Sequence, residues 1–113
     1  MKGVHILADF ENCSNKQLLL DKSLLKLKLK KLIQKTDFKI IKECSYKFRG
    51  KGITEIFLIT ESHIAIHTWP ENNSLNLDIF TCNIKKNNKA TRLFEDMRKL
   101  FLPKKIKKRI IKR

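Results

Sequence analysis

The run Glu61-Ser62-His63-Ile64-Ala65-Ile66-His67-Thr68-Trp69-Pro70-Glu71 constrains the fold most, because apolar residues alternate in it with polar and ionisable ones. Successive side chains of a strand point to opposite faces of a sheet, so this alternation predicts a strand with one buried face. We expect it over 64–69, because Pro70 lacks the N–H that a sheet ladder needs. One face would carry His63, Ala65 and His67, and the other Ile64, Ile66 and Thr68.

Further short strands and two helices are expected around this run. Strand patterns cover residues 4–8, 38–46, 53–60 and 75–82, and the tail from Lys105 could add one more. Turn residues occupy 11–15, 50–52 and 72–74. Helical spacing predicts helices at 16–35 and 89–102, the second capped by Asn87-Asn88. The order β-α-β-β-β-β-α-β predicts an α+β fold: a two-layer sandwich of one antiparallel sheet with two helices on one face.

The charge balance is strongly basic, with 26 Lys and Arg against 11 Asp and Glu in a single domain of 113 residues. Such a charge suits nucleic acid or another anionic surface. Lys dominates, however, whereas base recognition favours the bidentate fork of Arg, and no nucleic-acid-binding motif is present. We therefore expect no specific nucleic-acid partner. The tail 103–113 could bind phosphate without specificity, or form an edge strand protected by Lys.

The three cysteines, Cys13, Cys44 and Cys82, form no Cys-x-x-Cys pair. This pattern predicts reduced thiols, a cytoplasmic protein and no structural zinc site. No apolar run approaches the roughly 20 residues of a membrane span, so we expect no membrane partner. His63 and His67 would suit two metal ligands on a helix, but the strand pattern argues against that, and we predict no metal.

Four side chains, three in this run and one after it, are weighed as candidates for chemistry. His67, beside Trp69, suits proton transfer, whereas for His63 a structural role is the simpler interpretation. A hairpin would bring Cys82 beside the strand 64–69, where it could be a small hydrophobe or could protonate a reacting carbon. Ser62 lacks the glycine neighbours of a hydrolase nucleophile.

The string from Thr60 to Glu71, followed by Asp78-Ile79-Phe80-Thr81-Cys82, closely resembles the small prokaryotic S-adenosylmethionine decarboxylase proenzymes. The segments His5-Ile6-Leu7-Ala8-Asp9-Phe10 and Phe48…Gly52-Ile53-Thr54 are also similar to that family. The resemblance extends from residue 3 to about residue 102. Asn72-Asn73-Ser74 and Glu55 depart from the family pattern, which usually has an aromatic-Gly-aromatic turn and a small residue there.

The resemblance implies a zymogen that cleaves itself between Glu61 and Ser62. The Ser62 hydroxyl would attack the preceding carbonyl and turn the amide into an ester. Elimination would then release a 1–61 beta chain from a 62–113 alpha chain, and hydrolysis with loss of ammonia would leave a pyruvoyl group at residue 62. His67 matches the family's proton acceptor in this processing, and Thr54 stands where a residue assists it.

The same resemblance implies roles in decarboxylation. The pyruvoyl group would form a Schiff base with the substrate amine and act as electron sink, without PLP or a metal. Cys82 matches the family's proton donor. Phe48, Trp69 and Glu71 match positions near the substrate, although the two aromatic residues could instead be core.

The resemblance implies S-adenosylmethionine as substrate, spermidine biosynthesis as destination of the product, and a homodimer of cleaved protomers. Arginine decarboxylation on the same scaffold is an alternative, and a basic nucleic-acid-binding module is a third. Strict alternation would place Ser62 on the face opposite His67. We therefore expect a local break in the strand at Ser62.

Overall fold

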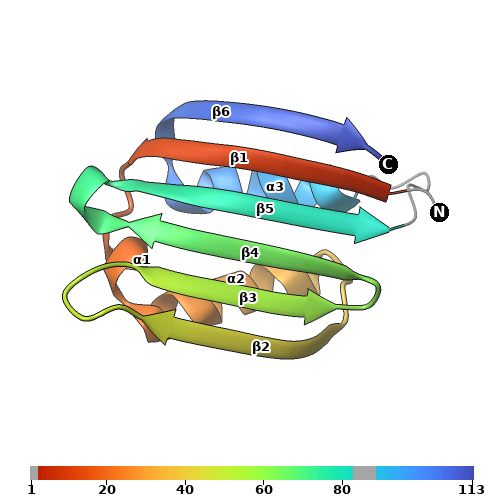
Figure 1. Cartoon of the computed structure of the whole chain (residues 1–113), viewed down its shortest axis with the longest axis horizontal. Coiled ribbons are helices and arrows are strands. Elements are labelled where there is room, and N and C mark those ends of the chain that lie inside the picture. Colours follow the sequence, from red (N-terminus) through yellow and green to blue (C-terminus); the bar gives the residue numbers. More distant parts are fainter. Residues whose placement is uncertain (1–2, 83–88) are drawn as a thin grey trace.

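The computed structural model describes residues 3–82 and 89–113, which form a six-stranded antiparallel sheet in the order β2-β3-β4-β5-β1-β6. Within these residues the helices all lie on one face of the sheet (Figure 1). The elements are β1 (Gly3–Cys13), α1 (Gln17–Leu20), α2 (Lys22–Lys35), β2 (Ile40–Lys47), β3 (Ile53–Ile59), β4 (Ser62–Trp69), the 3-10 turn η1 (Pro70–Asn72), β5 (Ser74–Cys82), α3 (Lys89–Phe101) and β6 (Pro103–Lys112). The predicted two-layer α+β sandwich is confirmed.

The core lies between the sheet and the helices. Alternate residues of each central strand point into it, as Ile64, Ile66 and Thr68 of β4 do. The Phe10 ring packs edge-on against Phe94 and Phe101 of α3, with centroids 5.5 and 6.2 Å apart. Burying one such side chain contributes about 1.5–3 kcal/mol, so this layer supplies most of the stability of the fold.

The opposite face of the sheet, here called the open face, is covered by none of the described elements (Figure 1). It carries half-exposed apolar side chains: Leu7, Tyr46, Ile56, Leu58, Trp69 and Ile111. A patch of this kind is typical of a surface that contacts another molecule.

The helix expected over 16–35 is interrupted, and this part of the prediction is wrong. Asp21 has extended backbone angles, φ −101° and ψ 103°, and separates α1 from α2. Its carboxylate accepts a hydrogen bond from the Leu24 N–H at 3.0 Å and so caps α2. The apolar pattern of the sequence does not show this break, because α1 and α2 both bury leucines against the same face of the sheet.

Strand β1 is longer than expected, and the turn predicted at 11–15 begins later. The strand continues to Cys13 because it pairs on both sides, for example Phe10 with Leu75 of β5 and with Ile106 of β6. The tail forms an edge strand from Pro103, as one of the two alternatives predicts. The predicted Asn87-Asn88 cap lies outside the described residues. None of the described helices is both long and apolar enough to cross a membrane.

Candidate active site

The Glu61–Ser62 junction lies in the tight turn between β3 and β4. Glu61 adopts a left-handed backbone with φ 56°, which costs a non-glycine residue about 1–2 kcal/mol. Ser62 is the first residue of β4 and pairs with Ile59 of β3. The break expected at Ser62 therefore lies one residue earlier, at Glu61, and Ser62 itself follows the alternation of the strand.

The Ser62 side chain is buried on the face that the helices cover. Its hydroxyl oxygen accepts a hydrogen bond from the Cys82 backbone N–H at 3.1 Å. The antiparallel pairing of β4 with β5 brings these two residues together, as the hairpin prediction requires. The bond restrains the Ser62 hydroxyl at the start of β4.

Thr54 and His67 form a second polar group, on the open face. They are direct partners in the β3–β4 register, and Thr54 Oγ1 shares a hydrogen bond of 2.9 Å with His67 Nδ1. This contact fixes the orientation of the ring and leaves Nε2 directed away from Thr54. An imidazole held in this way can accept or deliver a proton.

Trp69 belongs to the same group, and hydrogen bonds link it across the open face to strands β5 and β1. Its indole N–H donates to Asn76 Oδ1 at 2.6 Å, and the Asn76 amide donates to Asp9 Oδ1 at 2.7 Å. The sequence interpretation missed Asn76 and Asp9, because they come from β5 and β1. In both strands buried residues alternate with residues of the open face, and this alternation is the sequence signal that could have identified Asn76 and Asp9.

Phe48 and Glu71 lie exposed near this group. The Phe48 ring is 48% exposed and packs edge-on against Tyr46 with centroids 4.9 Å apart. Trp69 is 46% exposed, so neither aromatic residue is part of the core of a single chain. Glu71 lies in η1, directly after Pro70.

Gly52 fixes the turn that carries Phe48. A Cβ at this position would lie 1.8 Å from the Thr68 carbonyl oxygen, so no side chain fits. The Thr68 hydroxyl accepts from the Ile53 N–H at 2.8 Å and donates to the Leu19 carbonyl at 2.9 Å. This close approach explains why the chain needs glycine before β3.

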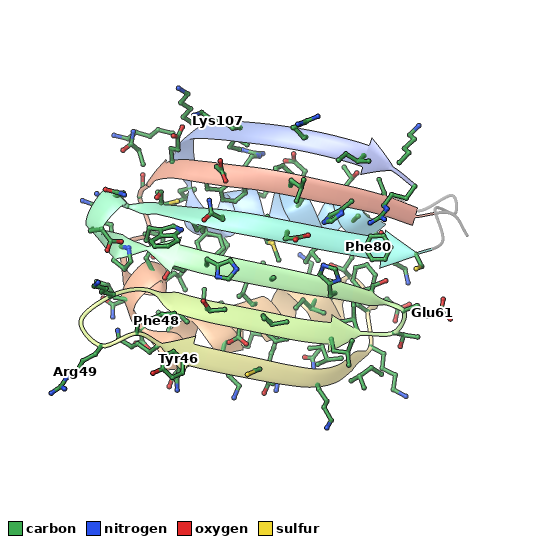
Figure 2. All side chains as sticks on the ribbon, viewed as in Figure 1. Tyr46, Phe48, Arg49, Glu61, Phe80 and Lys107 are labelled. Atoms are coloured by element: carbon green, nitrogen blue, oxygen red, sulfur yellow. The ribbon has the colours of Figure 1, made fainter. Side chains whose placement is uncertain are left out.

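The two groups lie at opposite ends of the sheet (Figure 2), with Glu61 at one end and Phe48 at the other. Ser62 and His67 are five residues apart on one strand, which corresponds to about 17 Å at the usual rise of a strand. Their side chains also point to opposite faces. A single copy of the chain therefore brings Ser62 together with Cys82, and Thr54 together with His67, but does not bring the two pairs together.

The other two cysteines are not part of either group. Burial raises the pKa of the Cys13 thiol to about 11, so the thiol stays protonated and unreactive. Cys44 is exposed on β2.

Comparison with known proteins identifies the family. The family model described as "S-adenosylmethionine decarboxylase" matches residues 4–113. A Clostridium botulinum (strain Hall) protein named S-adenosylmethionine decarboxylase proenzyme is 40% identical over 81 residues, 72% of this chain and 69% of that protein. An Archaeoglobus fulgidus protein of the same name is 36% identical over 93 residues, 81% of this chain and 82% of that protein.

A solved structure gives the same result. The adenosylmethionine decarboxylase from Aquifex aeolicus VF5 superposes with a TM-score of 0.89 at 29% identity, and the match covers 98% of this chain and 89% of that one. The fold and the sequence together define a decarboxylase of the carboxy-lyase class. The chain belongs to the S-adenosylmethionine decarboxylase family.

Proposed function

We propose that this chain is a zymogen that cleaves its own Glu61–Ser62 bond and then decarboxylates S-adenosylmethionine. The observation that carries the proposal is the left-handed Glu61, directly before a serine whose hydroxyl is held by the Cys82 N–H at 3.1 Å. Strain at the bond to be broken and a fixed nucleophile beside it are what an internal acyl shift requires.

The processing step follows from the positions of these atoms. The Ser62 hydroxyl attacks the Glu61 carbonyl carbon, the C–N bond breaks, and an ester joins the two residues. A base then removes the Ser62 α-proton, and the Glu61 carboxylate leaves as the new end of a 1–61 chain. Water converts the remaining dehydroalanine to a pyruvoyl group, with release of ammonia. His67, oriented by Thr54, is the proton acceptor that we assign to this sequence.

Because Ser62 and His67 lie far apart in one copy, we propose that two copies build each site. A two-fold axis that lies between two open faces and runs across the strands brings the Glu61–Ser62 end of one copy against the His67 end of the other. Because the Ser62 hydroxyl points to the covered face, His67 of the partner subunit would face the backbone of this junction and not the hydroxyl. The apolar side chains exposed on the open face favour such a contact, since burying them would stabilise a homodimer.

Each group then has a distinct role in decarboxylation. A pyruvoyl group at residue 62 supplies the electron sink that the loss of CO2 needs. The Cys82 backbone lies one hydrogen bond from residue 62, and we assign to its thiol, on the open face of β5, the return of a proton to the substrate carbon. Phe48 and Trp69 offer exposed ring faces to an adenine or a sulfonium, and Glu71 can accept from ribose hydroxyls.

S-adenosylmethionine is favoured as substrate because the curated relatives are named for it. No observation on this chain favours arginine. The product would feed spermidine biosynthesis. We assign the protein to the cytoplasm, because all three cysteines are free thiols.

Intact-mass measurement tests the processing step. We expect the 13.4 kDa chain to be replaced by fragments 1–61 and 62–113 on incubation, and Ser62→Ala to remain whole. Persistence of the uncleaved wild-type chain, or cleavage of the Ser62→Ala variant at the same bond, would contradict the proposal.

Release of CO2 tests the substrate. Processed protein is incubated in parallel with carboxyl-labelled S-adenosylmethionine and with labelled arginine, and we expect label release from the first alone. Release from arginine alone would assign the alternative activity. Salt-sensitive binding of nucleic acid by a chain that neither cleaves nor releases CO2 would indicate the basic binding module.

A further inference from the structure

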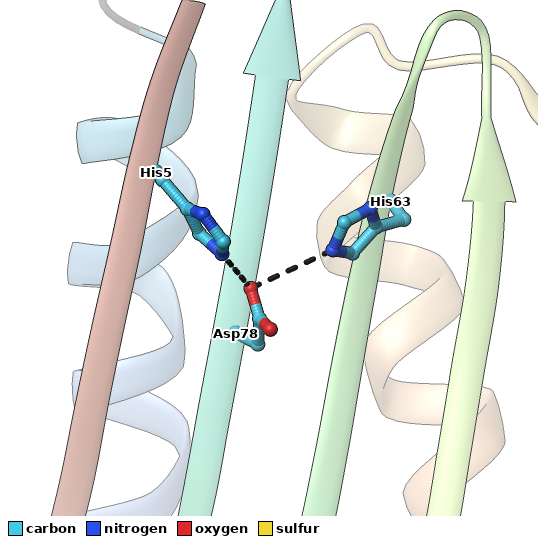
Figure 3. Close-up of polar contacts among 3 residues, drawn as sticks. All are labelled: His5, His63 and Asp78. Carbon is cyan, nitrogen blue, oxygen red and sulfur yellow. Dashed lines mark hydrogen bonds and ion pairs between the residues drawn. The ribbon is translucent and has the colours of Figure 1, made fainter. Parts of the chain in front are cut away.

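Two imidazoles and a carboxylate meet on the open face, close to the Glu61 end of the sheet (Figure 3). His5 comes from β1, His63 from β4 and Asp78 from β5. Asp78 Oδ1 shares a hydrogen bond with His5 Nε2 and lies 3.6 Å from His63 Nε2. The three atoms all lie within 4.8 Å of one another.

The register of the sheet builds this cluster. His5 and His63 are both direct partners of Phe80, one from each side, and Asp78 follows on the same face of β5. The Phe80 ring packs against both imidazoles, with centroids 5.6 and 5.7 Å apart. The two rings are therefore held in place by a neighbour that is not a ligand, which is the preorganisation that a metal site needs.

We propose that His5, His63 and Asp78 bind one divalent transition-metal ion of the zinc class. Atoms that share a tetrahedral zinc ion lie about 3.3–3.5 Å apart, and the His63–Asp78 pair matches this separation at 3.6 Å. His5 must withdraw slightly from Asp78, because an ion replaces their hydrogen bond. Two imidazoles and one carboxylate suit Zn²⁺, Co²⁺ or Ni²⁺ better than Mg²⁺ or Ca²⁺, which prefer oxygen alone.

The site is accessible and leaves a fourth coordination position. In a single copy the side chains of His5, Asp78 and His63 are 19, 38 and 42% exposed, so an ion can enter from the open face before that face pairs with the second copy of the proposed dimer. Water can occupy the fourth position.

The proposal is independent of the proposed function, because none of the three ligands has a role in the cleavage or decarboxylation described above. Cleavage after Glu61 would leave His5 on one chain and His63 with Asp78 on the other. An ion bound here would then join the two chains.

Metal titration of the purified protein, with segments 1–61 and 62–113 both retained, tests the site. After removal of bound metal with a chelator, Zn²⁺ is added in a calorimeter and Co²⁺ in a spectrophotometer, at about 0.15 M salt so that the overall positive charge is screened. We expect one ion per chain with a Kd in the micromolar range or below, and the intense visible absorption of four-coordinate Co²⁺.

Variants of each ligand locate the ion. His5→Gln, His63→Gln and Asp78→Asn should each weaken binding at least about 100-fold, because even loss of a residue that only supports a ligand costs about 10–100-fold. Glu95→Gln and Cys44→Ser are the matched controls: the first removes an exposed carboxylate of α3, and the second an exposed thiol that could bind zinc by itself. Both should bind as the wild type does.

Three results would overturn the proposal. These are no binding by the wild type at micromolar metal, unchanged binding in all three ligand variants while circular dichroism shows them folded, and loss of binding in either control. In the first case the cluster is a hydrogen-bonded His–Asp pair without an ion.

Discussion

At the scale of single residues, Ser62 and Cys82 are joined by a hydrogen bond that involves the backbone of the cysteine, so its thiol can be changed without breaking the contact. We predict that Cys82→Ala still cleaves at Glu61, because the N–H that holds the Ser62 hydroxyl remains. Decarboxylation should slow by about 10²–10⁴-fold, the usual contribution of a positioned proton donor. Fragment masses and CO2 release measure the two steps separately.

Cys44→Ala is the control for this experiment, since Cys44 is exposed on β2. It should match the wild type in both cleavage and turnover. Full turnover by Cys82→Ala would remove Cys82 as the proton donor.

Glu55 makes stability depend on pH. It is fully buried, Ser45 donates to its Oε1, and its Oε2 has no hydrogen-bond partner among the residues that the structure describes. Burial raises the pKa of this carboxyl, against the hydrogen bond from Ser45, which lowers it. The folded chain therefore binds this proton more tightly than the unfolded chain does, and the contribution to stability falls as pH rises from about 4.3, the ordinary glutamate value, through the raised pKa.

We predict that Glu55→Gln raises the free energy of unfolding at pH 8 by about 1–3 kcal/mol, the usual cost of an unsatisfied buried polar group, and that this gain shrinks toward pH 5. Urea denaturation at the two pH values measures it. Glu95→Gln, which removes an exposed carboxylate paired with Arg98, is the control and should cost no more than about 0.5 kcal/mol. A gain from Glu55→Gln that is equal at both pH values would contradict the raised pKa.

The sequence indicates candidate residues for the chemistry, but it does not indicate most of their contacts. Ser62 and His67 lie close together along the chain, so a single motif of consecutive residues points to both. The chain of contacts from Trp69 through Asn76 to Asp9 depends on the order of strands in the sheet, which residue types do not encode. Such long-range contacts become visible only with the register.

At the scale of the elements, the start of α2 depends on one side chain. The Asp21 carboxylate accepts from the Leu24 N–H, one of the donors that the first turn of a helix leaves unpaired. We predict that Asp21→Ala lowers the free energy of unfolding by about 0.5–2 kcal/mol, as measured by urea denaturation. Asp21→Asn keeps an acceptor oxygen and should retain most of the stability. An equal loss in both variants would show that charge, not capping, is what matters there.

The type and order of most elements were predictable, because alternation and helical spacing each reflect which side chains reach the core. The first and last residues of the elements were not predictable from the sequence. β1 runs past its apolar segment to Cys13 because β5 and β6 both pair with it, and the helical segment breaks at Asp21 although its leucines continue on either side. Both differences come from tertiary contacts that override local preference.

At the scale of the whole molecule, one copy of the chain holds two incomplete groups. Ser62 with Cys82 lies at one end of the sheet, and Thr54 with His67 at the other. The open face between them carries exposed apolar side chains and the proposed metal ligands. The proposed site shared between two copies would account for both the separation and the exposed surface.

Mixed dimers test this sharing. Ser62→Ala and His67→Ala chains, tagged differently, should each remain uncleaved when expressed alone. In a mixed dimer, one of the two shared sites combines the intact Ser62 of the His67→Ala chain with the intact His67 of the Ser62→Ala chain. We therefore predict that coexpression causes cleavage of the His67→Ala chain alone, at one of the two shared sites in each mixed dimer.

Mass spectrometry of the coexpressed pair identifies which chain is cut, by its tag. Coexpression of Ser62→Ala with a His67→Ala, Ser62→Ala double variant is the control, and neither chain should be cleaved because no intact serine remains. Failure of the first pair to cleave, although mixed dimers are recovered through both tags, would mean that each copy processes itself. The 17 Å or so between Ser62 and His67 would then have to close within one chain, which the continuous strand β4 opposes.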